Sequence, residues 1–273
     1  MSALLQVEIS VDYPDKPKVL DQLAFEIGPG EIVGFAGQSG SGKSTLALAI
    51  LRLLPRSASV EGQVQFRGGN LLDRPASAMR QIRGKEIALA LQAAASALNP
   101  HLRIETQIRE AWQAHEKTPW NVGRQRALQT LAAMDLECDD AFLRRYPHQV
   151  SIGQAQRIVL AMALLHRPAL LIADEPTSAL DLMAQLELLR LLKKVNREFG
   201  ASILYISHDL TTFRHLCDRI CVLNRGRVVE SGTPAQIFET PKAEFTRDLI
   251  ATHHALTSPK SFLYPATNDL TRA

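Results

Sequence analysis

The amino-acid sequence predicts an α/β fold with a mostly parallel sheet wrapped by helices. Three short apolar runs, at residues 32–36, 169–173 and 202–207, have the composition of strands buried on both faces. A segment of helical composition at 182–199 separates the second run from the third. Residues 75–166 are rich in Ala, Leu, Gln and Arg, which indicates an inserted helical region. Strands that alternate with helices favour a parallel sheet.

Local patterns supply the remaining elements in chain order. Residues 5–12 alternate between apolar and polar side chains, as a half-buried strand does. The same argument, with glycine and proline as breakers, gives strands at 19–27 and 60–66, a helix at 45–54 and two short paired strands within 218–229. Short helices follow from residue 233. Residues 259–273 are expected to form a loose tail, so that residues 1–258 make one domain.

The charge pattern does not point to a nucleic-acid partner. The chain of 273 residues has 31 Lys and Arg against 28 Asp and Glu, a formal net charge of +3. These charges are interspersed rather than gathered into basic arms. Short pairs such as Arg144-Arg145 fit solvated helix faces, with contacts to phosphates, lipid head groups or a partner as the alternative.

Cysteine content and hydropathy bear on the compartment and on any membrane role. Cys138, Cys217 and Cys221 form no CxxC pair, and buried free thiols in a reducing cytosol fit this pattern. The N-terminus lacks the basic start and apolar run of a secretion signal. No apolar stretch approaches the ~20 residues of a bilayer-spanning helix. If the protein works at a membrane, we expect a partner to supply the spanning segments.

The strongest functional motif is the segment from Gly37 to Ser44, which fits the pattern G-x-x-x-x-G-K-[ST]. It follows the apolar run at 32–36 and precedes the helix expected at 45–54. In such a loop, small residues let backbone N–H groups turn toward phosphate oxygens, and the helix N-terminus adds a positive dipole. Lys43 is expected to reach the β- and γ-phosphates of a nucleotide, and the Ser44 hydroxyl is expected to ligate Mg²⁺.

A second candidate site lies at the end of the apolar run 169–173, where Asp174 and Glu175 follow. Because ligands bind at the carboxyl ends of parallel strands, Asp174 is expected to hold Mg²⁺ and Glu175 to act as general base toward the attacking water. Taken alone, this pair has another explanation, because acidic residues also occur as caps at the start of a helix. His208 follows the run 202–207 and can touch the γ-phosphate, although a lone histidine at such a place is more often structural.

Together these motifs resemble the ATP-binding cassette family, whose markers occur here in the family's order. Gln92 resembles the family's Q-loop residue, Ser151 to Gln154 its signature, residues 178–181 its D-loop and His208 its switch histidine. The resemblance extends over about residues 5–250. It implies a P-loop NTPase core with a mostly parallel sheet, an antiparallel β subdomain and a helical subdomain inserted at about residues 75–166.

The resemblance also implies roles for individual residues, with ATP and Mg²⁺ as the cofactors. It implies that ATP is bound by Tyr13, stacked on adenine, and by the loop residues Gly37, Gln38, Ser39, Gly40, Ser41, Gly42, Lys43, Ser44 and Thr45. A surface tyrosine is the alternative for Tyr13. The implied Mg²⁺ ligands are Ser44, Gln92 and Asp174, the implied catalytic residues are Glu175 and His208, and Asp181 belongs to the D-loop.

Members of this family work as head-to-tail dimers. This implies that Ser151, Gly153 and Gln154 act in trans on a nucleotide held by a second subunit. The family pattern here is Leu-Ser-Gly-Gly-Gln, whereas this chain has Ile152 in place of the first glycine. A β-branched residue at that place is expected to crowd the nucleotide and to weaken the site formed with the other subunit's phosphate loop.

Within the family, the chain resembles the peptide and nickel importer branch. The similarity lies in Leu98-Asn99-Pro100 and in Tyr146-Pro147-His148-Gln149 before the signature. Some members of that branch carry a C-terminal cysteine cluster for an iron–sulfur centre, and none is expected here because Cys221 is the last cysteine. Residues 93–95 are alanines where the branch commonly has an acid after the glutamine, which weakens the expected coupling.

The leading hypothesis is an ATP-hydrolysing subunit that powers import of peptides or nickel complexes. Its expected partners are a second ATPase subunit in a heterodimer, two transmembrane permease subunits and, indirectly, an extracytoplasmic solute-binding protein. The expected location is the cytoplasmic face of the inner membrane. The alternative is a soluble ATPase of an enzyme assembly such as the carbon–phosphorus lyase system. A nucleotide-binding regulatory module without turnover is disfavoured by Glu175 and His208, which serve hydrolysis.

Overall fold

A central six-stranded sheet organises the molecule in the computed structural model, which describes residues 2–90, 97–178 and 180–257. The strand order is β10-β9-β3-β8-β7-β6. The strands are β3 (Ile32–Ala36), β6 (Ile87–Ala90), β7 (Leu170–Asp174), β8 (Ser202–Ser207), β9 (Arg219–Asn224) and β10 (Arg227–Gly232). All neighbours pair in parallel except β9 and β10, which form an antiparallel hairpin. The mostly parallel sheet predicted from the apolar runs is confirmed.

A separate four-stranded antiparallel sheet is built from the alternating segments near the N-terminus. Its order is β2-β1-β4-β5, with bounds Lys16–Ile27, Leu5–Tyr13, Ser59–Phe66 and Gly69–Asn70. The apolar side chains of β1 point to one face, and Leu5, Val7, Ile9 and Val11 are all buried. This sheet is the antiparallel β subdomain that the family resemblance implies.

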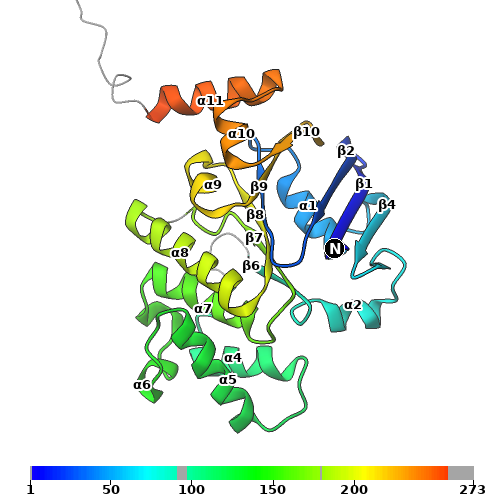
Figure 1. Ribbon diagram of the computed structural model, residues 1–273. Helices are drawn as coiled ribbons and strands as arrows, with labels where there is room; N and C mark the ends of the chain where they lie inside the picture. The colour runs from blue at the N-terminus through cyan, green and yellow to red at the C-terminus, as the bar shows by residue number, and fades with distance from the viewer. Residues whose placement is uncertain (1, 91–96, 179, 258–273) are drawn as a thin grey trace, which may run out of the picture.

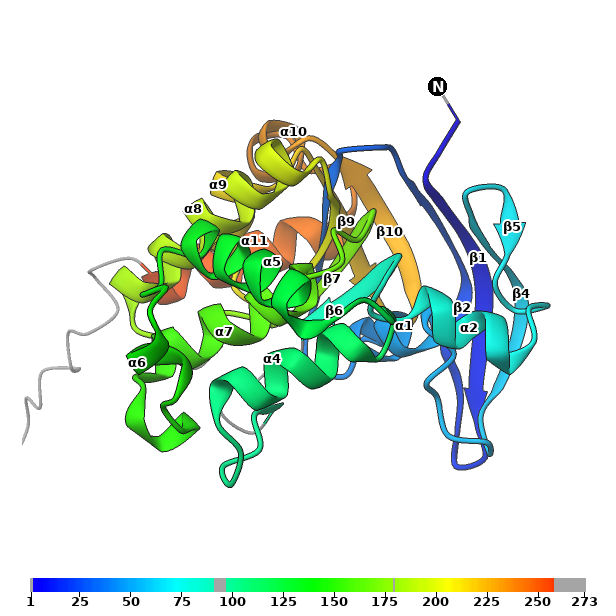
Figure 2. The ribbon, with the colours of Figure 1, turned by 90° about the horizontal axis from the view of Figure 1, so that it is seen from below.

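The helices lie on both faces of the central sheet. They are α1 (Lys43–Ile50), α2 (Ala76–Ile82), α4 (Ile104–Gln113), α5 (Trp120–Ala133), α6 (Asp140–Leu143), α7 (Ile152–Leu164), α8 (Leu182–Phe199), α9 (Leu210–Leu216), α10 (Pro234–Glu239) and α11 (Glu244–Thr257). Figure 1 shows α7, α8 and α9 on one side of the sheet, and α1 with the antiparallel sheet on the other. In Figure 2, the cluster of α4 to α7 lies at the end of the molecule away from β1, β2 and β4.

The period of two along each buried strand divides the core into two clusters. Leu170 and Ile172 of β7 pack with α1 and the antiparallel sheet. Leu171 and Ala173 of the same strand pack with the helices on the opposite face. Each buried strand therefore joins the two layers, and its carboxyl end is held rigidly from both sides. No helix within the described ranges is long and apolar enough to cross a bilayer.

The helical insertion expected at residues 75–166 starts later than predicted. Residues 87–90 form β6, an edge strand of the central sheet in which Ile87 pairs with Leu170 and Ala90 with Ala173. The preceding α2 buries Met79 and Ile82 against the α1 side of the core. The sequence Ile-Ala-Leu-Ala in β6 is short and half alanine, so its composition matches the neighbouring helices. The helix expected at 45–54 likewise ends at Ile50, and Arg52 adopts a left-handed conformation with φ of 52°.

Candidate nucleotide-binding site

The glycine-rich loop connects the carboxyl end of β3 to the N-terminus of α1, as predicted. Gly42 is the N-cap of α1 and has φ of +107°, a conformation that favours glycine. A Cβ atom at this position would also lie 2.6 Å from Leu20 Cδ2 and 2.8 Å from the Val19 carbonyl. Glycine is therefore required at this N-cap, from which the backbone N–H groups of the first turn of α1 can bind an anion.

The Lys43 side chain folds back over the loop from which it projects. Its Nζ donates to the Gly37 carbonyl at 2.8 Å and to the Gln38 carbonyl at 2.9 Å. Burial lowers the pKa of the Lys43 ammonium, while the carboxylates of Glu175 and Asp174 oppose that shift. The cation thus lies inside the loop and near both acids. This position suits an ammonium that contacts the terminal phosphates of a nucleotide.

Asp174 ends β7 and is 6% exposed. Burial raises the pKa of its carboxyl, with a further contribution from Glu175, while the Ser44 hydroxyl and Lys43 lower it. Its Oδ1 is buried without a hydrogen-bond partner among the described residues. A buried carboxylate oxygen without a partner, beside a serine hydroxyl, is a donor set that fits a hard divalent cation. The third predicted ligand, Gln92, lies outside the described residues.

Glu175 and His208 follow the ends of the adjacent strands β7 and β8, and their side chains meet. The Nδ1 of His208 lies 3.0 Å from Oε1 of Glu175. The Glu175 backbone N–H donates to the Ile206 carbonyl at 2.9 Å, and the residue adopts φ of +48°. For a non-glycine residue this left-handed backbone costs about 1–3 kcal/mol. The strain and the extra backbone hydrogen bond aim the carboxylate out of the sheet edge and toward the imidazole.

Lys43, Ser44 and Glu175 border a hollow of about 500 Å³. Its lining residues are Tyr13, Lys16, Val19, Ser39, Gly40, Gly42, Lys43, Ser44, Thr45 and Glu175. The volume lies in the range of small-ligand pockets, about 300–1,000 Å³. Lys16 and Val19 were missed by sequence reasoning. The available signal was the hairpin itself, since Lys16 is the cross-strand partner of Tyr13.

The predicted signature and D-loop residues gather around a different hollow, of about 700 Å³, which Ser151, Ile152, Gly153, Gln154 and Asp181 line together. Ser151 caps α7 by accepting from the Gln154 N–H at 3.1 Å, and the Gln154 side chain accepts from the Ser151 N–H at 3.0 Å. Ile152 follows the cap and is 58% exposed. None of these residues lines the hollow at the phosphate loop.

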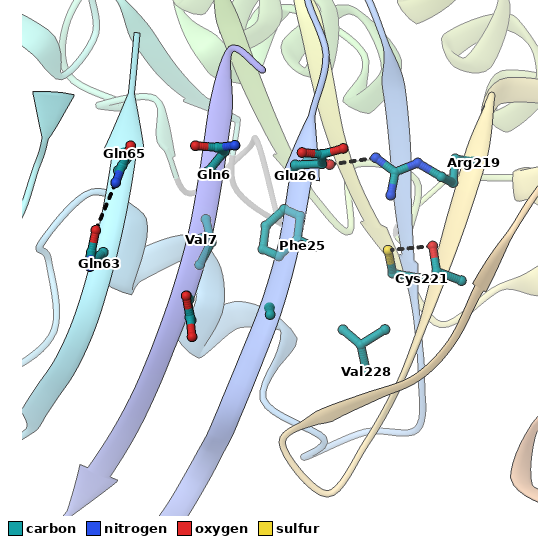
Figure 3. Close-up of a pocket in the computed structure, with 12 residues that line it drawn as sticks. Gln6, Val7, Phe25, Glu26, Gln63, Gln65, Arg219, Cys221 and Val228 are labelled. Carbon is teal, nitrogen blue, oxygen red and sulfur yellow. Dashed lines mark hydrogen bonds between the residues drawn. The ribbon is translucent and has the colours of Figure 1, made fainter. Parts of the chain in front are cut away.

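A third hollow of about 460 Å³ lies between the antiparallel sheet and the β9–β10 hairpin. Figure 3 shows Gln6, Gln63 and Gln65 on one wall, and Arg219 and Cys221 on the other. It contains none of the residues that the sequence predicts as functional. We therefore place the candidate site at the loop between β3 and α1.

Comparisons with known proteins give relatives that are named as ATP-binding proteins of transport systems. The "Peptidoglycan transport ATP-binding protein YejF" of Agrobacterium fabrum is 42% identical over 234 residues, which is 85% of this chain and 43% of that protein. The "Dipeptide transport ATP-binding protein DppD" of Haemophilus influenzae is 37% identical over 253 residues, which is 91% of this chain and 77% of that protein. The chain thus spans less than half of the first relative and about three-quarters of the second.

A solved structure and a family model lead to the same family. The dimeric structure of a post-hydrolysis state of the ATP-binding cassette MJ0796, bound to ADP and Pi, matches with a TM-score of 0.72 and 28% identity. The match covers 84% of this chain and 98% of that one. A family model described as ABC transporter matches residues 20–178, more than half of the chain. The chain belongs to the ABC transporter family, as one of its ATP-binding cassettes.

Proposed function

We propose that this chain is the ATP-binding and ATP-hydrolysing subunit of an importer whose cargo is peptide-like. The observation that carries the proposal is the joint position of Lys43, Asp174 and the Glu175–His208 pair at neighbouring strand ends. The names of the two relatives concern peptidoglycan and dipeptide transport, which favours peptides over nickel complexes as cargo. Neither name supports the soluble enzyme assembly as an alternative.

In this proposal the loop residues 37–45 hold the nucleotide. Backbone N–H groups at the start of α1 donate to the phosphate oxygens. The Lys43 ammonium gives up a hydrogen bond to a loop carbonyl and donates to the terminal phosphates instead. The Ser41 hydroxyl, buried without a partner among the described residues, can donate to the same phosphates. Tyr13, which also lines the hollow, stacks on the adenine ring.

Hydrolysis requires a water that is deprotonated as it attacks. Glu175 accepts a proton from the water while the water oxygen bonds to the γ-phosphorus and the bond from that phosphorus to the bridging oxygen breaks, which yields ADP and phosphate. His208 orients the Glu175 carboxylate through their contact, and its ring would face the γ-phosphate of a bound nucleotide. When Mg²⁺ is bound, it neutralises the phosphate charge, and Ser44, Asp174 and Gln92 are the proposed ligands.

A second ATPase subunit completes the site in this proposal. Within one chain, the hollow lined by Ser151, Gly153 and Gln154 is distinct from the hollow at Lys43. A head-to-tail partner would bring its own signature serine to this chain's phosphate loop, and the solved dimeric cassette bound to ADP and Pi supports a dimeric assembly. Because Ile152 alters only the site that this chain completes for its partner, a heterodimer accommodates it better than a homodimer.

The remaining proposed partners are two permease subunits and, indirectly, an extracytoplasmic solute-binding protein. The proposed location is peripheral, at the cytoplasmic face of the membrane. Support comes from the relatives, which are named as ATP-binding proteins of transport systems.

The test is purification of the tagged full-length chain from detergent-solubilised membranes of its native host, with identification of stoichiometric partners. We expect polytopic membrane proteins, a second ATPase and ATP hydrolysis that rises with peptide-loaded binding protein. A Lys43→Met chain, which should assemble with the same partners without this stimulation, is the control. Co-purification with a soluble enzyme core instead of membrane proteins would overturn the importer proposal.

A further inference from the structure

A hydrogen bond joins the first turn of α8 directly to the loop that carries His208. The Gln185 Nε2 donates to Oδ2 of Asp209 at 2.6 Å, across 24 residues of sequence. Asp209 is the residue immediately after His208 and is the N-cap of α9. Figures 1 and 2 both show α8 beside α9, so this bond lies where the two helices pack.

Gln185 belongs to a turn that is held by hydrogen bonds to the N-cap residue of α8. Asp181 caps α8 by accepting from the Ala184 N–H at 2.9 Å, and the Gln185 N–H donates to the Asp181 carbonyl at 2.9 Å. The intervening Leu182 and Met183 are 69% and 66% exposed, although both are large and apolar. The same turn therefore presents an apolar edge outward and Gln185 inward, toward the loop after β8.

Asp209 is fixed by partners on both of its carboxylate oxygens. Its Oδ1 accepts from the Thr211 N–H at 2.9 Å and from the Thr211 hydroxyl at 2.6 Å, while Oδ2 accepts from Gln185. Its own N–H donates to the Ser207 hydroxyl at 3.0 Å. Burial raises the pKa of this carboxyl, but the hydrogen bonds from Thr211 and Gln185 outweigh that effect, so its pKa lies below the usual value.

We propose that Gln185 is a positioning residue for His208. By holding Asp209, it sets the backbone on which His208 stands and therefore the contact between His208 and Glu175. Movement of the first turn of α8, when a second subunit covers Leu182 and Met183, is thereby transmitted to the hydrolytic pair. The inference rests on the proposed function, because it assumes that Glu175 and His208 act on ATP and that a second ATPase docks at this turn.

The alternative is that Gln185 only links α8 to α9 and has no effect on His208. Two variants distinguish this structural role from the positioning role. Gln185→Met keeps the length of the side chain and removes the donor. Asp209→Ser keeps a residue that caps helices well, so α9 stays capped, but its hydroxyl is too short to reach Gln185. The matched control is Gln129→Met, the same exchange at an exposed position of α5.

The first measurement is the ring ¹⁵N spectrum of the full-length chain with labelled histidine, in which His208 is assigned by its loss in His208→Ala. We expect the His208 resonance to move in Gln185→Met and in Asp209→Ser, and to stay in Gln129→Met. This measurement needs neither transport nor a partner, so it remains valid if the importer proposal fails.

The second measurement is ATP hydrolysis by the assembled complex. We expect each of the two variants to lower kcat on the order of tenfold, as small misplacements of reacting groups do, with unchanged ATP affinity. The double variant should be no slower than either single variant, since both remove the same bond. An unmoved His208 resonance, or losses in kcat that multiply in the double variant, would overturn the proposal.

Discussion

The imidazole Nδ1 of His208 and the carboxylate Oε1 of Glu175 lie 3.0 Å apart, although 33 residues separate them in the sequence. The contact follows from the parallel pairing of β7 and β8, in which Asp174 is the register partner of Ile206. The chain leaves both strands at the same edge of the sheet. Glu175 directly follows β7 and His208 directly follows β8, so their side chains meet at that edge.

Glu175→Gln should slow hydrolysis by a factor on the order of 10²–10⁴ in the assembled complex, because an amide cannot accept the proton of the attacking water. ATP affinity should stay within a few-fold of the parent, since the phosphate loop is untouched. Single-turnover hydrolysis and equilibrium ATP binding measure the two effects. Glu239→Gln, the same exchange at an exposed position, is the control. A rate close to that of the parent protein would remove Glu175 as the base.

Asp174→Asn should stabilise the nucleotide-free chain while removing its response to Mg²⁺. Burial raises the pKa of the Asp174 carboxyl, so its ionisation at neutral pH lowers the free energy of unfolding of the chain. For a domain of this size, an increase of ~1 kcal/mol corresponds to a melting temperature about 2–4 °C higher. Thermal unfolding with and without Mg²⁺ measures both effects.

The pH dependence of this stabilisation has a definite sign. The folded state binds the proton more tightly than the unfolded state does, so the cost is fully present above the raised pKa and disappears as the pH falls. The gain of Asp174→Asn over the parent protein should therefore be largest near pH 7 and shrink on acidification. A melting temperature that is lower in Asp174→Asn at pH 7 would contradict this account of the site.

Ile152→Gly should raise ATP hydrolysis of the assembled complex by roughly threefold, equivalent to about 0.6 kcal/mol. The Ile152 side chain is 58% exposed beside the cap of α7, where a partner's nucleotide is expected to approach. If the side chain itself is the obstacle, Ile152→Ala should give part of the same increase without the backbone freedom of glycine. An unchanged rate in both variants would show that Ile152 does not impair the site.

Much of the architecture could be predicted from the sequence because β3, β7 and β8 are short apolar runs and β1 alternates between buried and exposed residues. β6 was not predicted as a strand, since two of its four residues are alanines and its partner β7 lies about 80 residues later. The identities of Lys43, Asp174 and Glu175 followed from local motifs. The contact between Glu175 and His208 did not, because it depends on strand register rather than on sequence spacing.

Other features of the site depend on three-dimensional packing in the same way. The Lys43 side chain satisfies two carbonyls of its own loop, and no motif specifies that geometry. The bond between Gln185 and Asp209 joins two helices whose relative placement is set by the hydrophobic core between them. Such contacts depend on how the two layers pack on the central sheet.

The most direct test is equilibrium binding of ATP to the purified full-length chain in the presence of Mg²⁺. We expect saturable binding, and a dissociation constant about 10–100-fold larger in Lys43→Met, because that variant loses charge-assisted hydrogen bonds to the phosphates. Lys117→Met, at an exposed position, should bind as the parent protein does. Absence of measurable ATP binding, or equal affinity in the parent and in Lys43→Met, would contradict the assignment of the site.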